Sequence, residues 1–446
     1  MAHTPRAVRL LALALCCLLS LTGCGSFGAS VEDLLTAPAL DDQQAAILDT
    51  VRSYADTGIT LVYPKGGAYR NPITLQDIDG DDEPEAITFY TKKDEVKIHI
   101  NVAKKMEDYQ NGERWQVIYD IEGLGNQVNF IDFAHVGLLF YQNIIVGYSA
   151  FSEGGNTLVV YGFQSGELCE TMIQNYTEVA YGDLDGDMFD ELVLFNTPGD
   201  GAAGITADLY ERVGTPEAPY LGKTAQATLD PSLVRLRRLS VDSEGQYRLV
   251  YADGLSGDNQ MTTEALCYDG EKLYTLSQYE RQRGSETDYL TALTRQNTEL
   301  YSQDVDGDGH IEVPRLQKQQ SDSLYQQGGY FVDWYSGSSG GYTYKRTTYE
   351  DDSFHLRVTL LSGWVGSVTF QSENDGSART CLDAGGATVF SVLRISRSED
   401  AVAYTSSGFK ELGTYGSFTY LYKAGDSTLV HAASETEMAA AIEIKQ

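Results

Sequence analysis

Apolar positions follow three different patterns along the chain. Residues 10–21 are apolar apart from Ser20. Residues 41–55 repeat apolar side chains at helical spacing, and an aspartate at their start can cap a helix. From about residue 60 onward, short runs of Val, Ile, Tyr, Phe and Leu alternate with polar residues and stop at Gly, Asn or Asp clusters. This third pattern predicts many short β-strands joined by tight turns, as in a sandwich, a barrel or a propeller.

One acidic pattern occurs three times among these strands. Aspartates stand at its positions 1, 3 and 5, a glycine at position 4 and a glutamate at position 9, in Asp77–Glu85, Asp183–Glu191 and Asp304–Glu312. The starts are 106 and 121 residues apart, so weaker copies are expected midway, and Asp132 and Asp242 begin candidates. A unit of about 50–60 residues suits one four-stranded propeller blade. We therefore expect a mainly β, propeller-like repeat domain of about five to seven blades over residues 60–327.

The acidic repeats stop near Gly328. Alternating apolar segments such as 355–360 and 387–395 follow, and residues 435–444 are a candidate closing helix. We expect residues 328–446 to form a small α+β domain without an acidic loop.

The spacing of the acids suits a calcium ion. Calcium takes six to eight oxygen ligands, and alternating aspartates in a tight turn supply them. An EF-hand would need a glutamate at position 12, where this chain has Thr88, Leu194 and Arg315. Here the acid comes at position 9 and a strand follows at once, so the ion would lie in a strand-to-strand turn.

This pattern resembles the FG-GAP/VCBS repeats of integrin-type β-propellers, over roughly residues 60–325. In that family a D-x-D-G-D-x-x-x-D/E turn joins two strands of a blade and holds calcium. The family's glycine at position 6 is present only as Gly309, with Asp82 and Met188 in its place in the other loops, and the Phe-Gly and Gly-Ala-Pro signatures are not evident. The resemblance implies that the carboxylates at positions 1, 3, 5 and 9 are calcium ligands. These are Asp77, Asp79, Asp81, Glu85, Asp183, Asp185, Asp187, Glu191, Asp304, Asp306, Asp308 and Glu312.

The alternative is that the three segments are solvated acidic turns. They hold 15 of the chain's 64 acidic residues within 27 positions. Without a counterion these carboxylates would repel one another, and their pKa values would rise. Three calcium ions would supply six positive charges, so we interpret the expected ions as structural.

The net charge of −32 excludes some partners. Nucleic-acid binding needs clustered basic side chains, so no nucleic-acid partner is expected. Binding to anionic lipid through a cluster of basic side chains is disfavoured for the same reason. With 44 glycines, 30 tyrosines and only 10 prolines, the composition is typical of an extracellular β-protein.

The first 23 residues have the features of a lipoprotein signal peptide. Arg6 and Arg9 precede the apolar run, which is too short to be a comfortable permanent membrane span. The run ends in Leu21-Thr22-Gly23-Cys24, which resembles the bacterial lipobox, where cleavage precedes a lipid-bearing cysteine. The alternative is an ordinary secretory signal followed by a chance cysteine. We expect lipidation at Cys24, a tether and helix over residues 24–59, and a location on the extracellular face of the bacterial cell membrane.

The remaining cysteines, Cys169, Cys267 and Cys381, match neither a disulfide framework nor a metal-binding spacing. At most one pair could form, and small buried apolar residues are the favoured interpretation.

Catalytic signals are weak. Residues 337–341 match the G-x-S-x-G string, but they lie between aromatic β-like segments with no helix after them, which favours a Gly/Ser hairpin or linker over a nucleophile elbow. The six histidines form no recognised metal motif, and no catalytic residue can be nominated. Tyrosines in 335–344 could stack on sugars, although capping of sheet edges is the favoured interpretation.

The sequence thus favours a non-enzymatic surface lipoprotein that acts in binding or envelope assembly, with a cell-wall glycan or an envelope protein as possible partner. The alternative is a carbohydrate-active envelope hydrolase or lyase on a propeller scaffold. A solute-binding transport partner is disfavoured, because the chain lacks the alternating βα pattern of two-lobed receptors.

Overall fold

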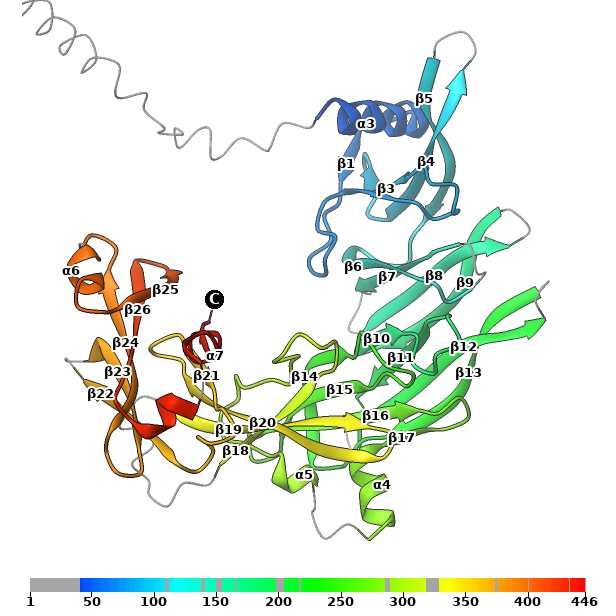
Figure 1. Ribbon diagram of the computed structural model, residues 1–446. Helices are drawn as coiled ribbons and strands as arrows, with labels where there is room; N and C mark the ends of the chain where they lie inside the picture. Colours follow the sequence, from blue (N-terminus) through cyan, green and yellow to red (C-terminus); the bar gives the residue numbers. More distant parts are fainter. Residues whose placement is uncertain are drawn as a thin grey trace, which may run out of the picture.

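The computed structural model describes residues 41–108, 112–137, 141–149, 155–164, 167–197, 204–215, 218–284, 289–317, 329–373, 376–399, 401–432 and 434–445 (Figure 1). The predicted signal peptide, Cys24 and the tether up to residue 40 lie outside the described residues. None of the helices in the described part of the chain is long and apolar enough to cross a membrane.

The predicted N-terminal helix is present as α3 (Asp42–Ala55). Asp41 caps it, because the Asp41 side chain accepts a hydrogen bond from the Gln44 N–H and the Gln44 side chain reaches back to the Asp41 N–H. Ile47 and Val51 are fully buried against the first sheet. The helix therefore covers one face of that sheet, as Figure 1 shows.

The rest of the described chain is mainly β and forms six antiparallel sheets. The first contains β1 (Ile59–Leu61), β2 (Ile73–Gln76), β3 (Glu85–Lys92), β4 (Ile98–Asp108) and β5 (Gly112–Glu122). The second contains β6 (Gln127–Ala134), β7 (Asn143–Ser149), β8 (Asn156–Gln164) and β9 (Glu167–Tyr176). The third contains β10 (Glu178–Gly182), β11 (Glu191–Asn196), β12 (Thr206–Thr215) and β13 (Ala218–Thr228). The fourth contains β14 (Leu233–Val241), β15 (Val250–Ser256), β16 (Met261–Tyr268) and β17 (Leu273–Thr275), followed by α4 (Leu276–Gln282) and α5 (Tyr289–Ala292).

The last two sheets use the C-terminal part of the chain. The fifth has the order β18 (Glu312–Leu316), β19 (Tyr330–Ser338), β20 (Gly341–Asp351), β21 (Leu356–Thr359), β27 (Ile442–Ile444). The sixth has the order β22 (Val368–Glu373), β23 (Ala378–Asp383), β24 (Thr388–Ser396), β26 (Phe418–Ala424), β25 (Lys410–Tyr415). Short helices α6 (Val402–Thr405), η3 (Thr428–Ala432) and α7 (Glu435–Ala440) lie between these strands in the sequence.

The second, third and fourth sheets share one design. Each has four strands that pair in chain order, so each is a simple meander. Their second strands begin at Asn143, Glu191 and Val250, and the corresponding strand of the first sheet begins at Glu85. The repeat of roughly 50–60 residues expected from the acidic segments is therefore present as a repeat of sheets.

The hydrophobic cores lie between consecutive sheets, which stand side by side in chain order (Figure 1). Neighbouring residues of β7 illustrate this, because Ile144 packs toward the first sheet and Ile145 toward the third. Strands covered on both faces need apolar side chains at successive positions, and this explains the unbroken apolar runs in β7 and β11.

In the described residues, no apolar cluster joins the first sheet to the fourth, fifth or sixth sheet. The mainly β prediction is confirmed, together with a succession of four-stranded antiparallel sheets. No closed ring of sheets is found among these residues, so the predicted propeller is not confirmed.

The fifth sheet spans the expected domain boundary. Its strands β18 and β19 pair across residues 327 and 328, with Val313 opposite Tyr335. The expected closing helix over residues 435–444 is present only as the short α7, because residues 442–444 instead form β27 and pair with β21. Ile442 is buried there, so the chain gains both a ladder and apolar burial by extending.

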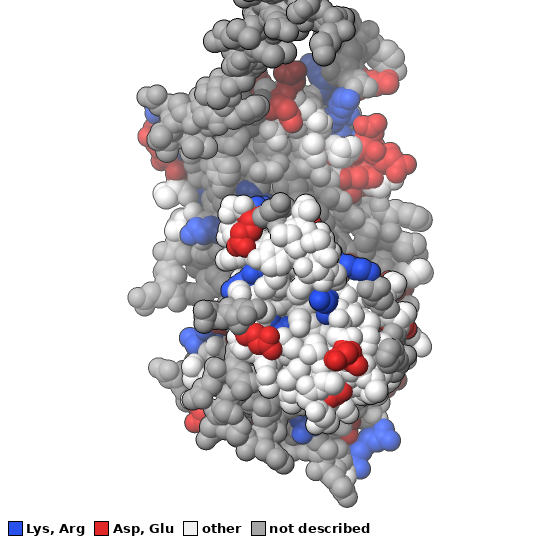
Figure 2. All heavy atoms as spheres, turned by 60° about the vertical axis from the view of Figure 1, so that its left-hand side comes forward, with Lys and Arg blue, Asp and Glu red and all other residues white. Residues whose placement is uncertain are grey.

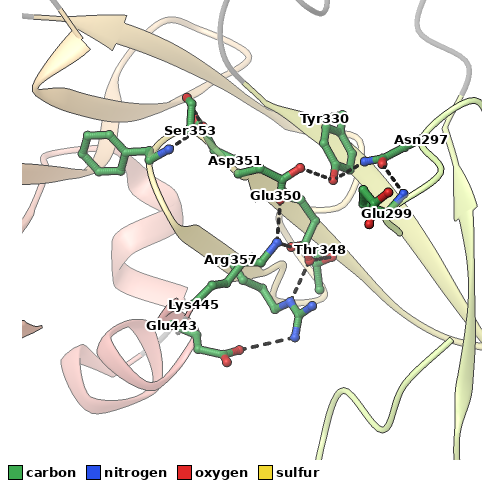
Figure 3. Close-up of polar contacts among 12 residues, drawn as sticks. Asn297, Glu299, Tyr330, Thr348, Glu350, Asp351, Ser353, Arg357, Glu443 and Lys445 are labelled. Carbon is green, nitrogen blue, oxygen red and sulfur yellow. Dashed lines mark hydrogen bonds and ion pairs between the residues drawn. The ribbon is translucent and has the colours of Figure 1, made fainter. Parts of the chain in front are cut away.

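Ion pairs fasten β27 to the fifth sheet (Figure 3). Glu350 is fully buried and its carboxylate lies 2.7 Å from the Arg357 Nε atom and 3.1 Å from the Lys445 Nζ atom. Arg357 also lies 3.6 Å from Glu443 of β27. The last strand is therefore held by charges as well as by its backbone ladder.

The acidic excess of the chain is not gathered on the face shown in Figure 2. Charged side chains are scattered there, and uncharged residues cover most of its described surface.

Candidate metal centres

Two of the three acidic segments form strand-to-strand turns, as the sequence predicts, whereas no strand directly precedes the third among the described residues. The first joins β2 to β3 and the second joins β10 to β11. The third leads into β18 and is closed by a bridge between Gln303 and Glu312. In each loop the position-9 glutamate is the first residue of the following strand.

The three loops share one backbone conformation. The glycines at position 4 have φ of 76°, 83° and 76°, a region that favours glycine. Position 6 also has positive φ in every loop, at 68° for Asp82, 78° for Met188 and 85° for Gly309. The loss of glycine at position 6 in two loops therefore leaves the turn intact, because Asp82 and Met188 adopt the left-handed conformation themselves.

The position-1 aspartate organises each loop. Its carboxylate accepts a hydrogen bond from the position-4 glycine N–H, at 2.7 Å for Asp77, 2.8 Å for Asp183 and 2.6 Å for Asp304. These bonds turn the chain back on itself and bring the acidic side chains together. Ligand oxygens of three acids in each loop lie within 4.8 Å of one another. The clusters are Asp77 with Asp79 and Glu85, Asp183 with Asp185 and Glu191, and Asp304 with Asp306 and Asp308.

The position-9 glutamates are buried, with exposed fractions of 0% for Glu85, 2% for Glu191 and 0% for Glu312. One oxygen of each accepts the backbone N–H of loop position 2, at 3.0, 2.7 and 3.0 Å respectively. The other oxygen of Glu312 is buried without a hydrogen bond, whereas the other oxygen of Glu85 lies 3.2 Å from the Lys104 Nζ atom. A buried carboxylate oxygen that has no donor and faces other acids is placed as a cation ligand would be.

Burial makes the charged form of these glutamates costly. Desolvation, followed by repulsion from the neighbouring aspartates, raises the pKa of Glu191 to about 8 and that of Glu312 to about 7. The pKa of Glu85 is raised as well, chiefly by burial. In the absence of a cation, these three glutamates therefore hold a proton more tightly than an exposed glutamate does.

The chain's own cations approach two of the three loops. The Lys104 Nζ atom contacts Asp79, lies 2.7 Å from Asp81 and lies 3.2 Å from the Oε1 atom of Glu85. This ammonium stands among the carboxylates of the first loop.

In the third loop, Arg346 contacts Asp306, and the Lys345 Nζ atom lies 3.0 Å from Asp308. Both cations come from β20 and reach the rim of the loop, leaving its buried Glu312 unpaired. For the second loop, no ion pair to Asp183, Asp185, Asp187 or Glu191 is found among the described residues.

The loops also connect neighbouring sheets. The Ile78 carbonyl of the first loop accepts the N–H of Gln142, which directly precedes β7 of the second sheet, at 3.0 Å. The Leu184 carbonyl of the second loop accepts the N–H of Arg248, which lies between β14 and β15 of the fourth sheet, at 3.1 Å. The Gly309 carbonyl of the third loop accepts the Ser243 N–H at 2.8 Å. The conformation of each loop therefore affects how neighbouring sheets pack. The spacing of the acids along the sequence did not indicate these contacts.

The two weaker copies do not form acidic clusters. Asp132 lies inside β6 rather than in a turn. Asp242 follows β14 and is buried, and its carboxylate accepts the backbone N–H groups of Leu249 and Ile311 at 3.1 and 2.7 Å. It therefore ties the fourth sheet to the end of the third loop instead of joining a cation site.

The geometry fits a divalent cation that prefers oxygen ligands. Each loop combines several carboxylates with a tight backbone, the ligand type that calcium and magnesium prefer. Nine of the twelve carboxylates expected from the sequence belong to the three clusters. Asp81, Asp187 and Glu312 do not, and Asp81 and Asp187 instead accept backbone N–H groups at loop position 7. The clusters could hold a metal ion, and their chemistry does not by itself identify calcium.

Two hollows could receive a ligand. One, of about 380 Å³, lies against the second and third sheets. Its lining residues include Asn129, Asp132, Asn156, Tyr176, Glu178 and Tyr181. The other, of about 510 Å³, lies beside α4 and includes the tilted pair Tyr274 and Tyr279.

The remaining sequence candidates have structural roles. Residues 337–341 lie in the β19–β20 hairpin, where Ser338 pairs with Gly341, so they are not a strand-to-helix elbow. Cys169, Cys267 and Cys381 are free, and burial raises the pKa of the Cys267 thiol.

Comparison with protein-family models finds no match for this chain, and comparison with curated proteins finds none either.

Proposed function

We propose that the chain is an extracellular bacterial lipoprotein, anchored through Cys24, whose FG-GAP/VCBS-like repeats are stabilised by calcium and act in non-enzymatic binding or envelope assembly. The observation that carries the proposal is the threefold occurrence of one loop geometry with a buried position-9 glutamate. Solvated acidic turns would have no reason to bury this group in every copy, because an unpaired buried carboxylate is costly.

Calcium is favoured within this proposal for two reasons. Its flexible coordination of six to eight oxygens tolerates loops that differ at position 6 and in their neighbouring cations. Extracellular modules typically bind it with dissociation constants on the order of 10⁻⁴–10⁻³ M, which suits an ion that is always present outside the cell. The ions would then fasten one sheet to the next, with a propeller-like arrangement of repeats as the corresponding fold.

A glycan of the cell wall is a suitable partner for the hollow against the second and third sheets. Amide side chains hydrogen-bond sugar hydroxyls, and tyrosine rings offer apolar faces, so Asn129, Asn156 and Tyr176 supply both kinds of contact. An envelope protein remains the other partner class.

Asp132 and Glu178 line the same hollow, and two carboxylates in one hollow favour the alternative of a carbohydrate-active hydrolase or lyase.

Calorimetric unfolding of the full chain with calcium and with excess chelator tests the structural role. Calcium should raise the melting temperature by several degrees, and an unchanged temperature would contradict the proposal.

Glycan-array binding, followed by a hydrolysis assay of any ligand, separates the two functions. Binding without turnover supports the first, whereas turnover that is lost in Asp132→Asn or Glu178→Gln supports the second.

Fatty-acid labelling of the wild-type chain and of Cys24→Ser tests the anchor. Label should enter only the wild-type chain. Label in both chains would remove Cys24 from the proposal.

A further inference from the structure

A fourth cluster of metal-ligating side chains lies in the first sheet, away from the acidic loops. His99 on β4 stands directly opposite Glu122 on β5, and Glu95 in the β3–β4 turn completes the group. Ligand atoms of the three residues lie within 4.8 Å of one another. The histidine is only 3% exposed, whereas the Glu95 and Glu122 side chains are 45% and 51% exposed, so the group opens to solvent on the glutamate side.

Asp120 orients the histidine, and two hydrogen-bond donors hold Asp120 in place. One Asp120 oxygen accepts hydrogen bonds from the Tyr90 hydroxyl and the Asn101 amide, each at 2.7 Å. The other oxygen lies 3.0 Å from the His99 Nδ1 atom. The Tyr90 ring also stacks on the imidazole, with ring centroids 5.0 Å apart. A carboxylate that already accepts two hydrogen bonds is a fixed acceptor, so this network assigns the proton of the imidazole to Nδ1.

The other imidazole nitrogen then points at a second acceptor. The His99 Nε2 atom lies 3.4 Å from the Glu95 Oε2 atom. With Nδ1 protonated, a neutral imidazole has only a lone pair at Nε2, and a lone pair facing a carboxylate oxygen is repulsive unless a cation lies between them. That cation can be a second proton on the ring or a metal ion.

The geometry fits a metal ion. Zinc bonds to nitrogen and oxygen are about 2.0–2.1 Å, and two ligands of a tetrahedral zinc ion are therefore about 3.3–3.4 Å apart. The His99 Nε2 and Glu95 Oε2 atoms are 3.4 Å apart, which agrees with this separation. A histidine that donates its other N–H to a carboxylate is also the usual support for a zinc ligand.

We propose that Glu95, His99 and Glu122 form a binding site for a zinc-class divalent cation, with Asp120 as the residue that positions His99. The three ligands leave one position for water. The proposal is independent of calcium in the acidic loops, because a nitrogen ligand favours zinc-class metals over calcium.

Lys97 would compete with a bound metal ion for the Glu122 carboxylate. Its ammonium contacts Glu122, but both side chains are more than half exposed, and such surface pairs contribute little to stability. A bound metal can therefore displace Lys97. This makes Lys97→Met informative, since removal of the competing charge should strengthen metal binding without touching a ligand.

Zinc titration of the full chain by calorimetry, in detergent and with excess calcium to occupy the acidic loops, tests the proposal. One saturable zinc site is expected. Binding should disappear in His99→Ala, weaken by about 10–100-fold in Asp120→Asn and strengthen in Lys97→Met. Glu107→Gln, an exposed carboxylate on the same strand, is the matched control and should leave zinc binding unchanged.

Nuclear magnetic resonance of the His99 ring separates the metal from the second proton. Added zinc should leave the Nδ1–H signal and abolish any Nε2–H signal. The absence of saturable zinc binding, its persistence in His99→Ala, or an imidazole that keeps both N–H groups in excess zinc would each overturn the site. Lys97→Met keeps the test decisive if His99→Ala fails to fold, because unchanged zinc affinity in Lys97→Met would also count against it.

Discussion

The Nζ atom of Lys104 lies 3.2 Å from the Oε1 atom of Glu85, the buried glutamate of the first acidic loop. The same ammonium reaches Asp79 and Asp81, so it occupies the region where those carboxylates converge. Burial alone would lower the pKa of Lys104, but its hydrogen bonds to the three carboxylates outweigh burial and raise the pKa. The three loops share one backbone conformation, but they differ in how many of their carboxylates pair with lysine or arginine side chains of the same chain. Because of this difference, we expect each loop to respond differently to calcium.

Replacement of Lys104 should convert the first loop into a stronger calcium site. In Lys104→Met the carboxylates lose their internal cation, so the chelated protein should be less stable by about 1–3 kcal/mol. Calcium should restore that stability and bind the loop more tightly than in the wild-type chain. Denaturant unfolding with and without calcium, together with calcium titration calorimetry, measures both effects. Lys93→Met, at an exposed lysine of the β3–β4 turn, is the control, and equal calcium affinity in wild type and Lys104→Met would refute the competition.

The second loop should account for much of the calcium effect, because no described ion pair balances its charge. At neutral pH, folding of the chelated protein must protonate the Glu191 carboxylate or bury its charge, and Glu191→Gln removes this cost, so the chelated variant should be more stable than the chelated wild-type chain. With calcium present the same change removes a ligand and should lower stability relative to wild type. Melting temperatures of both proteins in chelator and in calcium give this reversal of sign. A variant that is destabilised equally in both conditions would show that Glu191 has only a packing role.

The chelated protein should lose stability as pH rises from about 4.5 to 8. The folded-state pKa of Glu191, about 8, lies above the ordinary value of 4.5, so the folded state holds the proton more tightly than the unfolded state. The contribution of protonated Glu191 to folding stability is fully present below pH 4.5 and is lost as pH rises through about 8. Glu312, with a pKa of about 7, acts in the same direction. Denaturant unfolding across this range measures the slope, which should be much smaller in Glu191→Gln. A flat profile for the chelated wild-type chain would contradict the assigned burial cost.

Position 6 of the second loop should tolerate glycine better than position 4 tolerates alanine. Met188 has a φ of 78° and is largely exposed, so Met188→Gly relieves a conformation that costs an L-residue about 1–2 kcal/mol. Part of this gain is offset by the greater freedom of glycine in the unfolded chain, and the net effect should be neutral or stabilising by up to about 1 kcal/mol.

In Gly186→Ala, by contrast, the added Cβ would lie 2.9 Å from the Gln246 carbonyl oxygen at a φ of 83°. This variant should lose more than about 1 kcal/mol. Chemical denaturation of the two variants compares them directly, and a destabilised Met188→Gly would mean that the methionine side chain has a role of its own.

Arg357 should be needed for the attachment of the last strand. Arg357→Met leaves the buried Glu350 with one cation fewer, and removal of one partner of a buried ion pair costs about 3–5 kcal/mol. Part of the charge is still balanced by Lys445, so the loss should fall at or below the lower end of that range. Hydrogen exchange should show earlier opening of β27 than in the wild-type chain. Arg397→Met in the β24–α6 connection, at an exposed arginine, is the control.

The local features of the chain could be predicted from its residues. The spacing of Asp77, Asp79, Asp81 and Glu85, with Gly80 between them, is local information, and it specified the turn, the convergence of the carboxylates and the strand that follows. Helix α3 was predictable for the same reason, since its cap and apolar face lie within fifteen residues. The alternation of apolar and polar positions likewise determined that the chain would be mainly β.

Only the tertiary structure decided how these pieces meet. Lys104 enters the first loop from β4, and His99 meets Glu122 because β4 and β5 pair in one particular register. Pairing between strands depends on which apolar faces are buried together, and no spacing along the chain records that choice. The succession of sheets was visible as a repeat, but their arrangement in an open row among the described residues rests on the cores between neighbours, which form only when the whole chain has folded.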